Sequence, residues 1–314
     1  MTSKAKGKAE DNGNSYHLPV LLQEAVDALQ PKPDGVYVDC TFGGGGHSRE
    51  ILSRLGEGGK LAAFDQDADA ARNLPDDSRL TFIPENFRHL SRFLRLHNML
   101  PVDGLLADLG VSSHQFDEAE RGFSYRFDAP LDMRMDKRAG QTAADILNTY
   151  SAAQLQQMLS SYGEVSNSRT LAQALVERRE AGPVKTTQEL LALLEPLSRG
   201  KGYKYYSQVF QALRIEVNDE LGVLKQLLEQ LPGVMKEGGR VAIITFHSLE
   251  DRMVKQYFRN GGFEIAVDPL YGTRAKSPWK ELHRKPIEPS ANEIKNNDRS
   301  RSARLRVAQF AKNQ

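Results

Sequence analysis

Two stretches of this chain alternate short apolar runs with helical segments, and the stretch between them does not. The first alternating stretch has apolar runs bounded by turn residues at four places: 36–40, 60–65, 80–84 and 103–108. Such runs are typical of strands that are buried on both faces of a parallel sheet. Helical patterns at 49–55, 67–74 and 86–99 lie between them, so the β-α-β units predict a doubly wound sheet.

The middle stretch has a different texture. From about 141 to 199 it carries Ala, Leu, Gln and Glu at helical spacing with no convincing strand, which predicts an inserted helical subdomain. The segment 117–138 is polar, rich in Arg and Asp and aperiodic, and we interpret it as an ordered functional loop or hinge. The alternating pattern returns with a long amphipathic run at 208–231 and an apolar run at 240–246.

Two further apolar runs follow, at 263–267 and 304–310, and we expect them to be strands that pair antiparallel because no helical pattern separates them. A mainly parallel sheet that ends in an antiparallel strand is the plan of the Rossmann-like class I methyltransferases, an α/β fold, and this is the fold class we predict. The predicted organisation is a disordered tail at 1–15, a methyltransferase domain formed by 16–116 and 208–314, and a mostly helical substrate-recognition insertion at 117–207.

Composition narrows the functional classes. The 42 Lys and Arg residues nearly balance the 41 Asp and Glu residues, so a net charge of +1 excludes a polycation that coats nucleic acid. No apolar run approaches the roughly 20 residues that cross a bilayer, and residues 1–15 lack the apolar core of a secretory signal. Cys40 is the only cysteine, which excludes an intramolecular disulfide and zinc sites built on paired cysteines. We therefore expect a cytoplasmic protein without a membrane segment.

The most informative motif is Asp39-Cys-Thr-Phe-Gly-Gly-Gly-Gly-His47, which lies between a predicted strand and a predicted helix. Glycine has no Cβ, so such a loop can turn sharply and let a ligand approach the backbone closely. Four successive glycines exceed what a simple tight turn needs. The motif therefore predicts a nucleotide-cofactor site.

Charge distinguishes between two kinds of cofactor. The dinucleotide fingerprint Gly-x-Gly-x-x-Gly fits poorly, because its third glycine would fall on Ser48 or Arg49. Asp39 at the strand end suits S-adenosylmethionine, whose amino group and sulfonium are cationic where a dinucleotide has an anionic pyrophosphate. Asp65 ends the next strand, where its carboxylate can accept hydrogen bonds from ribose hydroxyls; the alternative is an N-cap for the helix that starts at Asp67.

Several long motifs follow one another along the chain: Asp108-Leu-Gly-Val-Ser-Ser-His-Gln115, Pro130-Leu-Asp-Met-Arg-Met135, Ser207-Gln-Val-Phe-Gln-Ala-Leu-Arg-Ile-Glu-Val-Asn218, Phe246-His-Ser-Leu-Glu-Asp-Arg252 and Ser300-Arg-Ser-Ala-Arg-Leu-Arg306. In this order they resemble the RsmH family, also called MraW, which methylates N4 of a cytidine in the decoding centre of small-subunit ribosomal RNA. The resemblance covers nearly everything after the first fifteen residues, the glycine loop included.

The resemblance implies S-adenosyl-L-methionine as the cofactor. It also implies a set of cofactor contacts: Gly45, Gly46, His47, Asp65, Phe87, Asp108 and Gln115. Phe87 would lie against the adenine ring, although a lone aromatic residue near a helix start is also typical of a core. The implied partner is 16S rRNA, in the 30S subunit or a late assembly intermediate, with the helical insertion forming part of the substrate cleft. A homodimer is left open.

The implied reaction assigns a role to Asp108. The exocyclic amine of cytosine is a poor nucleophile because its lone pair is delocalised, so the base must be splayed out and oriented. Our hypothesis is that Asp108 and the backbone carbonyls of Leu109 and Gly110 accept hydrogen bonds from this amine. The alternative is that Asp108 only binds the cofactor or orders the loop.

Four residues are candidates for substrate contact: Ser112, Ser113, Arg121 and Arg134. The two serines could meet a phosphate or the base, or they could cap a helix. The two arginines could lie near the RNA backbone, or they could pair with neighbouring acidic residues. No cluster of His, Asp and Glu has metal-ligand spacing, so we predict no metal site.

Two other functional classes stay open. The same fold would serve a methyltransferase that acts on a small molecule or a protein. A dinucleotide-dependent or noncatalytic protein is the third class, which binding of NADH in place of S-adenosylmethionine would support.

Overall fold

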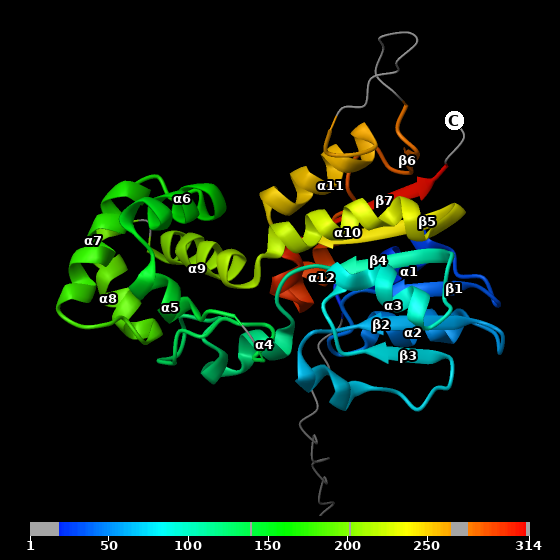
Figure 1. Ribbon diagram of the computed structural model, residues 1–314, viewed down its shortest axis with the longest axis horizontal. Coiled ribbons are helices and arrows are strands. Elements are labelled where there is room, and N and C mark those ends of the chain that lie inside the picture. The colour runs from blue at the N-terminus through cyan, green and yellow to red at the C-terminus, as the bar shows by residue number, and fades with distance from the viewer. Residues whose placement is uncertain (1–18, 139, 201, 265–275, 312–314) are drawn as a thin grey trace, which may run out of the picture.

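The computed structural model describes residues 19–138, 140–200, 202–264 and 276–311. Its centre is a seven-stranded sheet in the order β3-β2-β1-β4-β5-β7-β6 (Figure 1). The strands are β1 (Val36–Asp39), β2 (Lys60–Phe64), β3 (Leu80–Ile83), β4 (Val102–Asp108), β5 (Met235–Thr245), β6 (Trp279–Glu281) and β7 (Arg304–Phe310). Strands β1 to β5 pair in parallel, whereas β7 is antiparallel to both β5 and β6. The predicted fold class, a Rossmann-like sheet with an antiparallel last strand, is confirmed.

Helices cover both faces of the sheet: α1 (Leu22–Leu29), α2 (Gly46–Arg54), α3 (Leu90–Leu96), α10 (Glu220–Val234) and α11 (Ser248–Asn260). Successive residues of a strand point to opposite faces. Leu105 of β4 and Ile243 of β5 thus belong to a buried cluster with α3, α10 and α11. The next residues in the two strands, Leu106 and Ile244, belong to another cluster with α1 and α2. Burial on both faces explains why the strands are apolar throughout.

A helical body lies beside the sheet (Figure 1). It consists of α5 (Ala143–Thr149), α6 (Ala152–Gly163), α7 (Ser168–Glu180), α8 (Thr187–Leu197) and α9 (Gly202–Asn218). Its buried side chains form a hydrophobic cluster separate from those of the sheet. The helices α5, α6 and α8 each begin at a hydroxyl residue in a reciprocal capping box: Thr142, Ser151 and Thr186. Helix α9 crosses the predicted boundary between 207 and 208 without a break, and its side chains as far as Val217 pack into or against the helical cluster.

The last part of the sheet differs from expectation. Phe263 and Glu264 of the predicted strand 263–267 are not in a strand, and 265–267 lie outside the described residues, as does the predicted tail at 1–15. Besides β5, the strand that pairs with β7 is β6 and not the predicted strand 263–267. The expected absence of a helix before β7 is wrong, because α12 (Ala291–Asn296) lies between β6 and β7. This helix has six residues and starts at the N-cap Ser290, so it is too short to show an apolar period.

Across the described ranges, none of the helices combines the length and the apolar character that a membrane span requires.

Candidate active site

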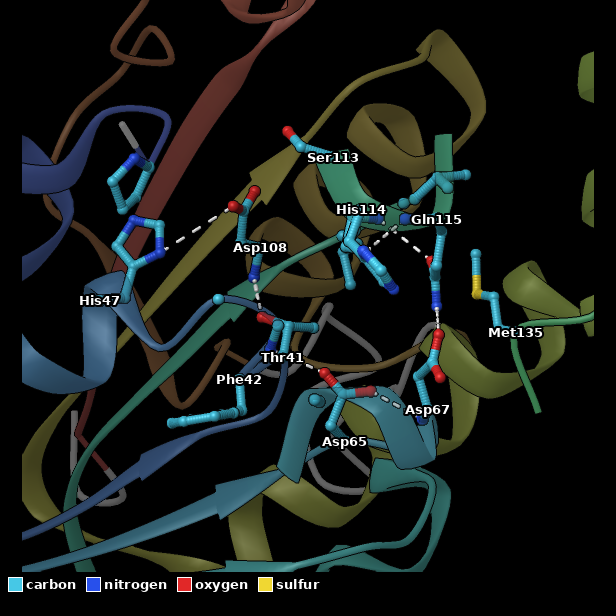
Figure 2. Close-up of a pocket in the computed structure, with 18 of the residues that line it drawn as sticks. Thr41, Phe42, His47, Asp65, Asp67, Asp108, Ser113, His114, Gln115 and Met135 are labelled. Carbon is cyan, nitrogen blue, oxygen red and sulfur yellow. Dashed lines mark hydrogen bonds and ion pairs between the residues drawn. The ribbon is translucent and has the colours of Figure 1, made fainter. Parts of the chain in front are cut away.

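A cavity of about 1170 Å³ opens where the strands β1, β2, β4 and β5 end (Figure 2). The residues at or just after these strand ends line it: Cys40, Thr41, Asp65, Asp108 and Phe246. The order β2-β1-β4 makes the gap between β1 and β4 the point at which the chain switches from one side of the sheet to the other. Ligands of open α/β sheets bind at this point, outside the carboxyl ends of the strands.

Backbone geometry explains the glycines that follow β1. Gly43 and Gly45 have φ values of 49° and 75°, which side chains with a Cβ rarely adopt. A Cβ on Gly45 would lie 2.8 Å from the ring of Phe42, and one on Gly46 would lie 2.1 Å from Cγ of Pro19. Gly43 and Gly46 line the cavity, whereas Gly45 does not. Gly45 therefore acts by permitting the turn.

Asp39 lies beneath this loop. It is fully buried, and its carboxylate accepts hydrogen bonds from Ser48 Oγ at 2.7 Å and from the backbone nitrogen of Thr41 at 3.0 Å. It does not line the cavity, which conflicts with the predicted direct contact to the cofactor. Asp39 ties the loop to α2, and its negative charge raises the pKa of Asp65 and of Asp108.

Asp65 lines the cavity just after β2. Its Oδ2 accepts a hydrogen bond from the backbone nitrogen of Gly43 at 2.7 Å, and its Oδ1 accepts one from that of Asp67 at 2.8 Å. Each oxygen retains acceptor capacity for a ligand hydroxyl. Burial raises the pKa of Asp65 to about 6, although the two hydrogen bonds oppose the rise. The N-cap of the following 3-10 helix η1 (Ala68–Asn73) is Asp67, so capping that helix is not the role of Asp65.

Asp108 ends β4 and points into the cavity (Figure 2). Its backbone nitrogen donates to Thr41 Oγ at 2.7 Å, which fixes the position of the strand end. Its Oδ1 is buried and has no hydrogen-bond partner within the described residues. Burial raises the pKa of Asp108 well above its ordinary value, and the charges of Asp39 and Glu250 raise it further. A buried carboxyl oxygen without a partner is costly, and a cationic or donating ligand would remove that cost.

His47 and Phe87 line other parts of the cavity. His47 is 4% exposed, its Nε2 lies 3.1 Å from the carbonyl oxygen of Val20, and its Nδ1 lies 3.9 Å from Oδ2 of Asp108. Burial lowers the pKa of His47, so its neutral form is favoured. Phe87 is partly buried and packs against the core of the sheet, so it is both a core residue and part of the cavity wall.

Gln115 and Arg121 meet at Asp67 in the wall of the cavity. Gln115 Nε2 and Arg121 Nη1 both donate to Asp67 Oδ2, each at 2.8 Å. Arg121 is 2% exposed, and its Nη2 donates to the carbonyl oxygens of Arg134 and Met135 at 3.0 and 3.1 Å. This burial conflicts with the predicted contact between Arg121 and RNA. Gln115 does line the cavity, and its contact with the cofactor stays a prediction.

The other three candidates for substrate contact differ in position. Ser112 and Ser113 line the cavity, and Ser112 is also the N-cap of α4 (Ser113–Asp117), in a capping box with Gln115. Arg134 does not line the cavity. Its Nε and Nη2 donate to the two carboxylate oxygens of Asp132 at 2.7 and 2.9 Å, so pairing with a neighbouring acidic residue describes Arg134.

Sequence reasoning missed three residues that come together at one end of the cavity. Glu220 begins α10, Glu250 lies in the first turn of α11, and both line the cavity. His247, the N-cap of α11, lies beside them. Glu220 is far from the other two in sequence, so no local spacing groups the three. The motif Phe246–Arg252 contains His247 and Glu250, and it was the only sequence feature that pointed to either of them.

The fold and this cavity define a class of protein. A parallel sheet with an antiparallel last strand, a glycine loop after β1 and carboxylates at the next strand ends are the features of a class I methyltransferase. The model of the MraW methylase family matches residues 14–311, and the chain belongs to this family.

Curated relatives agree over nearly the whole chain. The ribosomal RNA small subunit methyltransferase H of Bacteroides thetaiotaomicron is 53% identical over 296 residues, which cover 94% of this chain and 97% of that protein. The protein of the same name from Cytophaga hutchinsonii is 56% identical over 298 residues, which cover 94% of this chain and 99% of the other. A solved structure titled as a putative rRNA-methylase from Clostridium thermocellum covers 94% of this chain and 99% of its own, at 12% identity and a TM-score of 0.43.

Proposed function

We propose that the protein transfers a methyl group from S-adenosyl-L-methionine to N4 of a cytidine in the decoding centre of 16S rRNA. The substrate would be the 30S subunit or a late assembly intermediate. The relatives are named as methyltransferases of small-subunit ribosomal RNA, which supports this class of substrate. The motifs that resemble the RsmH family support the cytidine and the N4 position.

One observation carries the choice of cofactor: the unpartnered Oδ1 of Asp108 in a cavity whose buried groups are mainly acidic. Burial raises the pKa of Asp65 and of Asp108, and neighbouring carboxylates raise both further, so a cation nearby would stabilise their charged forms. A cationic ligand would provide this stabilisation, whereas the pyrophosphate of a dinucleotide would oppose it. The residues present therefore fit S-adenosylmethionine.

Four groups of this chain would hold the donor. The carboxylate of Asp65 suits the ribose hydroxyls, the ring of Phe87 suits adenine, and the backbone of Gly43 and Gly46 permits a close approach. Asp108 adds a negative charge near the cationic groups of the donor without contacting them, so its Oδ1 stays available to the substrate. When bound, S-adenosylmethionine supplies a methyl group on a positively charged sulfur, which is open to direct displacement.

Asp108 has two tasks in this proposal. Its free Oδ1 accepts a hydrogen bond from the cytosine amine and so orients the nitrogen lone pair. The methylated nitrogen must then lose a proton, and a carboxylate whose pKa is raised by burial is a better acceptor for it than an ordinary one. The neutral ring of His47, with Nδ1 at 3.9 Å, lies on the other side of this carboxylate.

The position of the helical body is an argument for a large substrate. It lies beside the sheet (Figure 1), its helix α9 contributes Asn218 to the cavity wall, and the segment 117–138 that leads to it contributes Met135. A base stacked in a helix cannot reach this cavity, so the cytidine has to be splayed out of the folded RNA. We propose that the helical body binds the RNA around it.

Mapping of modified nucleotides tests the substrate. Small subunits from cells that lack this protein would be incubated with the purified protein and donor, and their RNA analysed by mass spectrometry. We expect one new methyl group on N4 of one cytidine. Methylation of free nucleosides or of extract protein in its place would refute the RNA substrate, and binding of NADH without S-adenosylmethionine would refute the methyl donor.

The variant Asp108→Asn tests the catalytic role. We expect donor affinity to change by less than about tenfold while the single-turnover rate falls by about 10²-fold or more, because the amide cannot accept the proton. Asp103→Asn at the opposite end of β4 is the matched control and should keep the rate. Loss of donor affinity with an unchanged rate at saturation would assign Asp108 to cofactor binding alone.

A further inference from the structure

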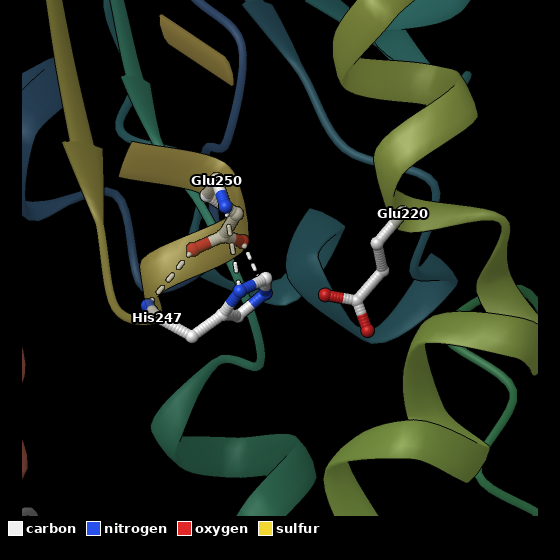
Figure 3. A group of neighbouring side chains, drawn as sticks. All are labelled: Glu220, His247 and Glu250. Carbon is white, nitrogen blue, oxygen red and sulfur yellow. Dashed lines mark hydrogen bonds and ion pairs between the residues drawn. The ribbon is translucent and has the colours of Figure 1, made fainter. Parts of the chain in front are cut away.

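The group formed by Glu220, His247 and Glu250 has the composition of a metal site. Figure 3 shows the carboxylate of Glu220, at the start of α10, and the imidazole of His247, at the start of α11, facing one another. One ligand atom from each of the three residues lies within 4.8 Å of the other two. The side chains of Glu220 and Glu250 are 9% and 3% exposed, so this is a buried group of acidic residues rather than a solvated surface.

An unpartnered nitrogen is directed into this group. The side chain of His247 is 7% exposed, and its Nε2 is buried without a hydrogen-bond partner in the part of the chain that the structure describes. Oε1 of Glu250 is 3.3 Å away, but the two atoms are not aligned as a hydrogen bond. A cation between this ring nitrogen and the carboxylate oxygens would satisfy both, because no aligned hydrogen bond does so.

The other contacts hold the ligand atoms in place and leave them capacity for an ion. Glu250 Oε2 accepts the backbone nitrogen of Phe246 at 2.9 Å, which directs Oε1 toward His247. Arg214 donates to both oxygens of Glu220, from Nε at 2.7 Å and from Nη2 at 3.0 Å. Each carboxylate oxygen has a second lone pair, so these hydrogen bonds orient the carboxylates and still leave a lone pair on each oxygen to coordinate an ion.

We propose that Glu220, His247 and Glu250 bind a divalent transition-metal ion on the wall of the cavity. One imidazole and two carboxylates match Zn²⁺, which takes mixed nitrogen and oxygen ligands, better than Mg²⁺, which prefers oxygen alone. Nitrogen and oxygen ligands of tetrahedral zinc are roughly 3.3 Å apart. His247 Nε2 and Glu250 Oε1 already lie 3.3 Å apart, so Glu220 is the ligand that would move toward the other two, by up to about 1.5 Å. Binding at Nε2 places the ring proton on Nδ1 and gives up the weak bond from the backbone nitrogen of Glu250, at 3.4 Å.

The ion would have the cavity on one side. Both glutamates line the cavity, so three protein ligands would leave a coordination position open toward it. An oxygen of a substrate phosphodiester has the charge for that position, and this part of the inference rests on the proposed function. The metal site itself does not, because it is defined by the residues of this chain alone.

Three conservative variants test the ligands without removing the helix cap. Glu220→Gln retains an acceptor for Arg214, Glu250→Gln retains the capping box, and His247→Asn retains a favourable N-cap. His114→Asn is the matched control, since His114 is an exposed histidine with Asp69 and Glu118 within 4.0 Å. The full chain would be stripped with a chelator and titrated with Zn²⁺ by calorimetry, without donor or RNA.

We expect one Zn²⁺ per chain, no saturable binding of Mg²⁺ in its place, and affinity for Zn²⁺ at least about tenfold weaker in each of the three variants. Absence of saturable Zn²⁺ binding to the unmodified protein would overturn the proposal, as would binding that only His114→Asn weakens. Anomalous scattering from zinc-soaked crystals of the unmodified protein gives a second answer that does not depend on how the variants fold. An ion found away from all three residues would overturn the site.

Discussion

The variant Arg121→Met removes a cation from inside the cavity wall. The guanidinium of Arg121 pairs with Asp67 at 2.8 Å, with the two side chains 3% and 9% exposed, and it also donates to the carbonyl oxygens of Arg134 and Met135. Methionine has a similar length and no charge. The variant therefore leaves a buried carboxylate and two carbonyl groups without this donor.

The expected loss follows from these contacts. Removing one partner of a buried ion pair costs about 3–5 kcal/mol, and each carbonyl that loses its donor adds about 1 kcal/mol. Asp67 retains hydrogen bonds from Gln115 and from the backbone nitrogen of Asp69, which favours the lower end of the ion-pair cost. We expect the free energy of unfolding to fall by about 5 kcal/mol in total.

Chemical denaturation followed by circular dichroism measures this loss. Arg138→Met is the matched control, because Arg138 donates to both oxygens of Asp136 at 2.9 Å with its side chain 52% exposed, and it should cost less than about 1 kcal/mol. The double variant with Asp67→Asn should lose less than the sum of the single losses, since no uncompensated charge remains. A loss for Arg121→Met as small as that of the control would refute the reasoning.

Further predictions concern the cofactor, the glycine loop and acid stability. Because burial raises the pKa of Asp65 to about 6, calorimetry should show donor affinity falling by up to about tenfold per pH unit below that value, since protonation turns one carboxylate oxygen from an acceptor into a donor; constant affinity would contradict this. Gly45→Ala should lower the free energy of unfolding by about 1–3 kcal/mol, whereas Gly44→Ala, with open space at its Cβ, should cost less in the same denaturation assay; equal losses would contradict the steric argument. Burial raises the pKa of Asp251, but the hydrogen bonds and charge of Arg306 outweigh it and hold the pKa below the ordinary value. The Asp251–Arg306 pair stabilises the fold above about pH 4, and this stability is lost as the pH falls through the depressed pKa of Asp251. The variant Asp251→Asn should therefore make the free energy of unfolding depend less on pH in the acid range, and an unchanged dependence would show that this pair does not contribute.

Local patterns in the sequence determined the framework of this protein. Strands buried on both faces are apolar throughout and helices have a period near 3.6, so the sheet and the helical stretch could be predicted without long-range information. Glycines after β1 and aspartates after β2 and at the end of β4 could be placed at the cavity because parallel strands bring their carboxyl ends to the same edge. These inferences need only the order of elements along the chain.

Packing between distant segments decided the rest. Asp39 and Arg121 are residue types that often contact ligands, but both are buried here. Asp39 lies beneath the glycine loop and bonds to Ser48, whereas Arg121 lies behind the cavity wall and pairs with Asp67. Glu220 and His247 meet only because α9 leads into α10 at the same sheet edge where β5 leads into α11. Residue type and spacing show what chemistry a side chain can perform. Its partners often come from segments far away in the sequence, and no sequence period reveals which distant segments will meet.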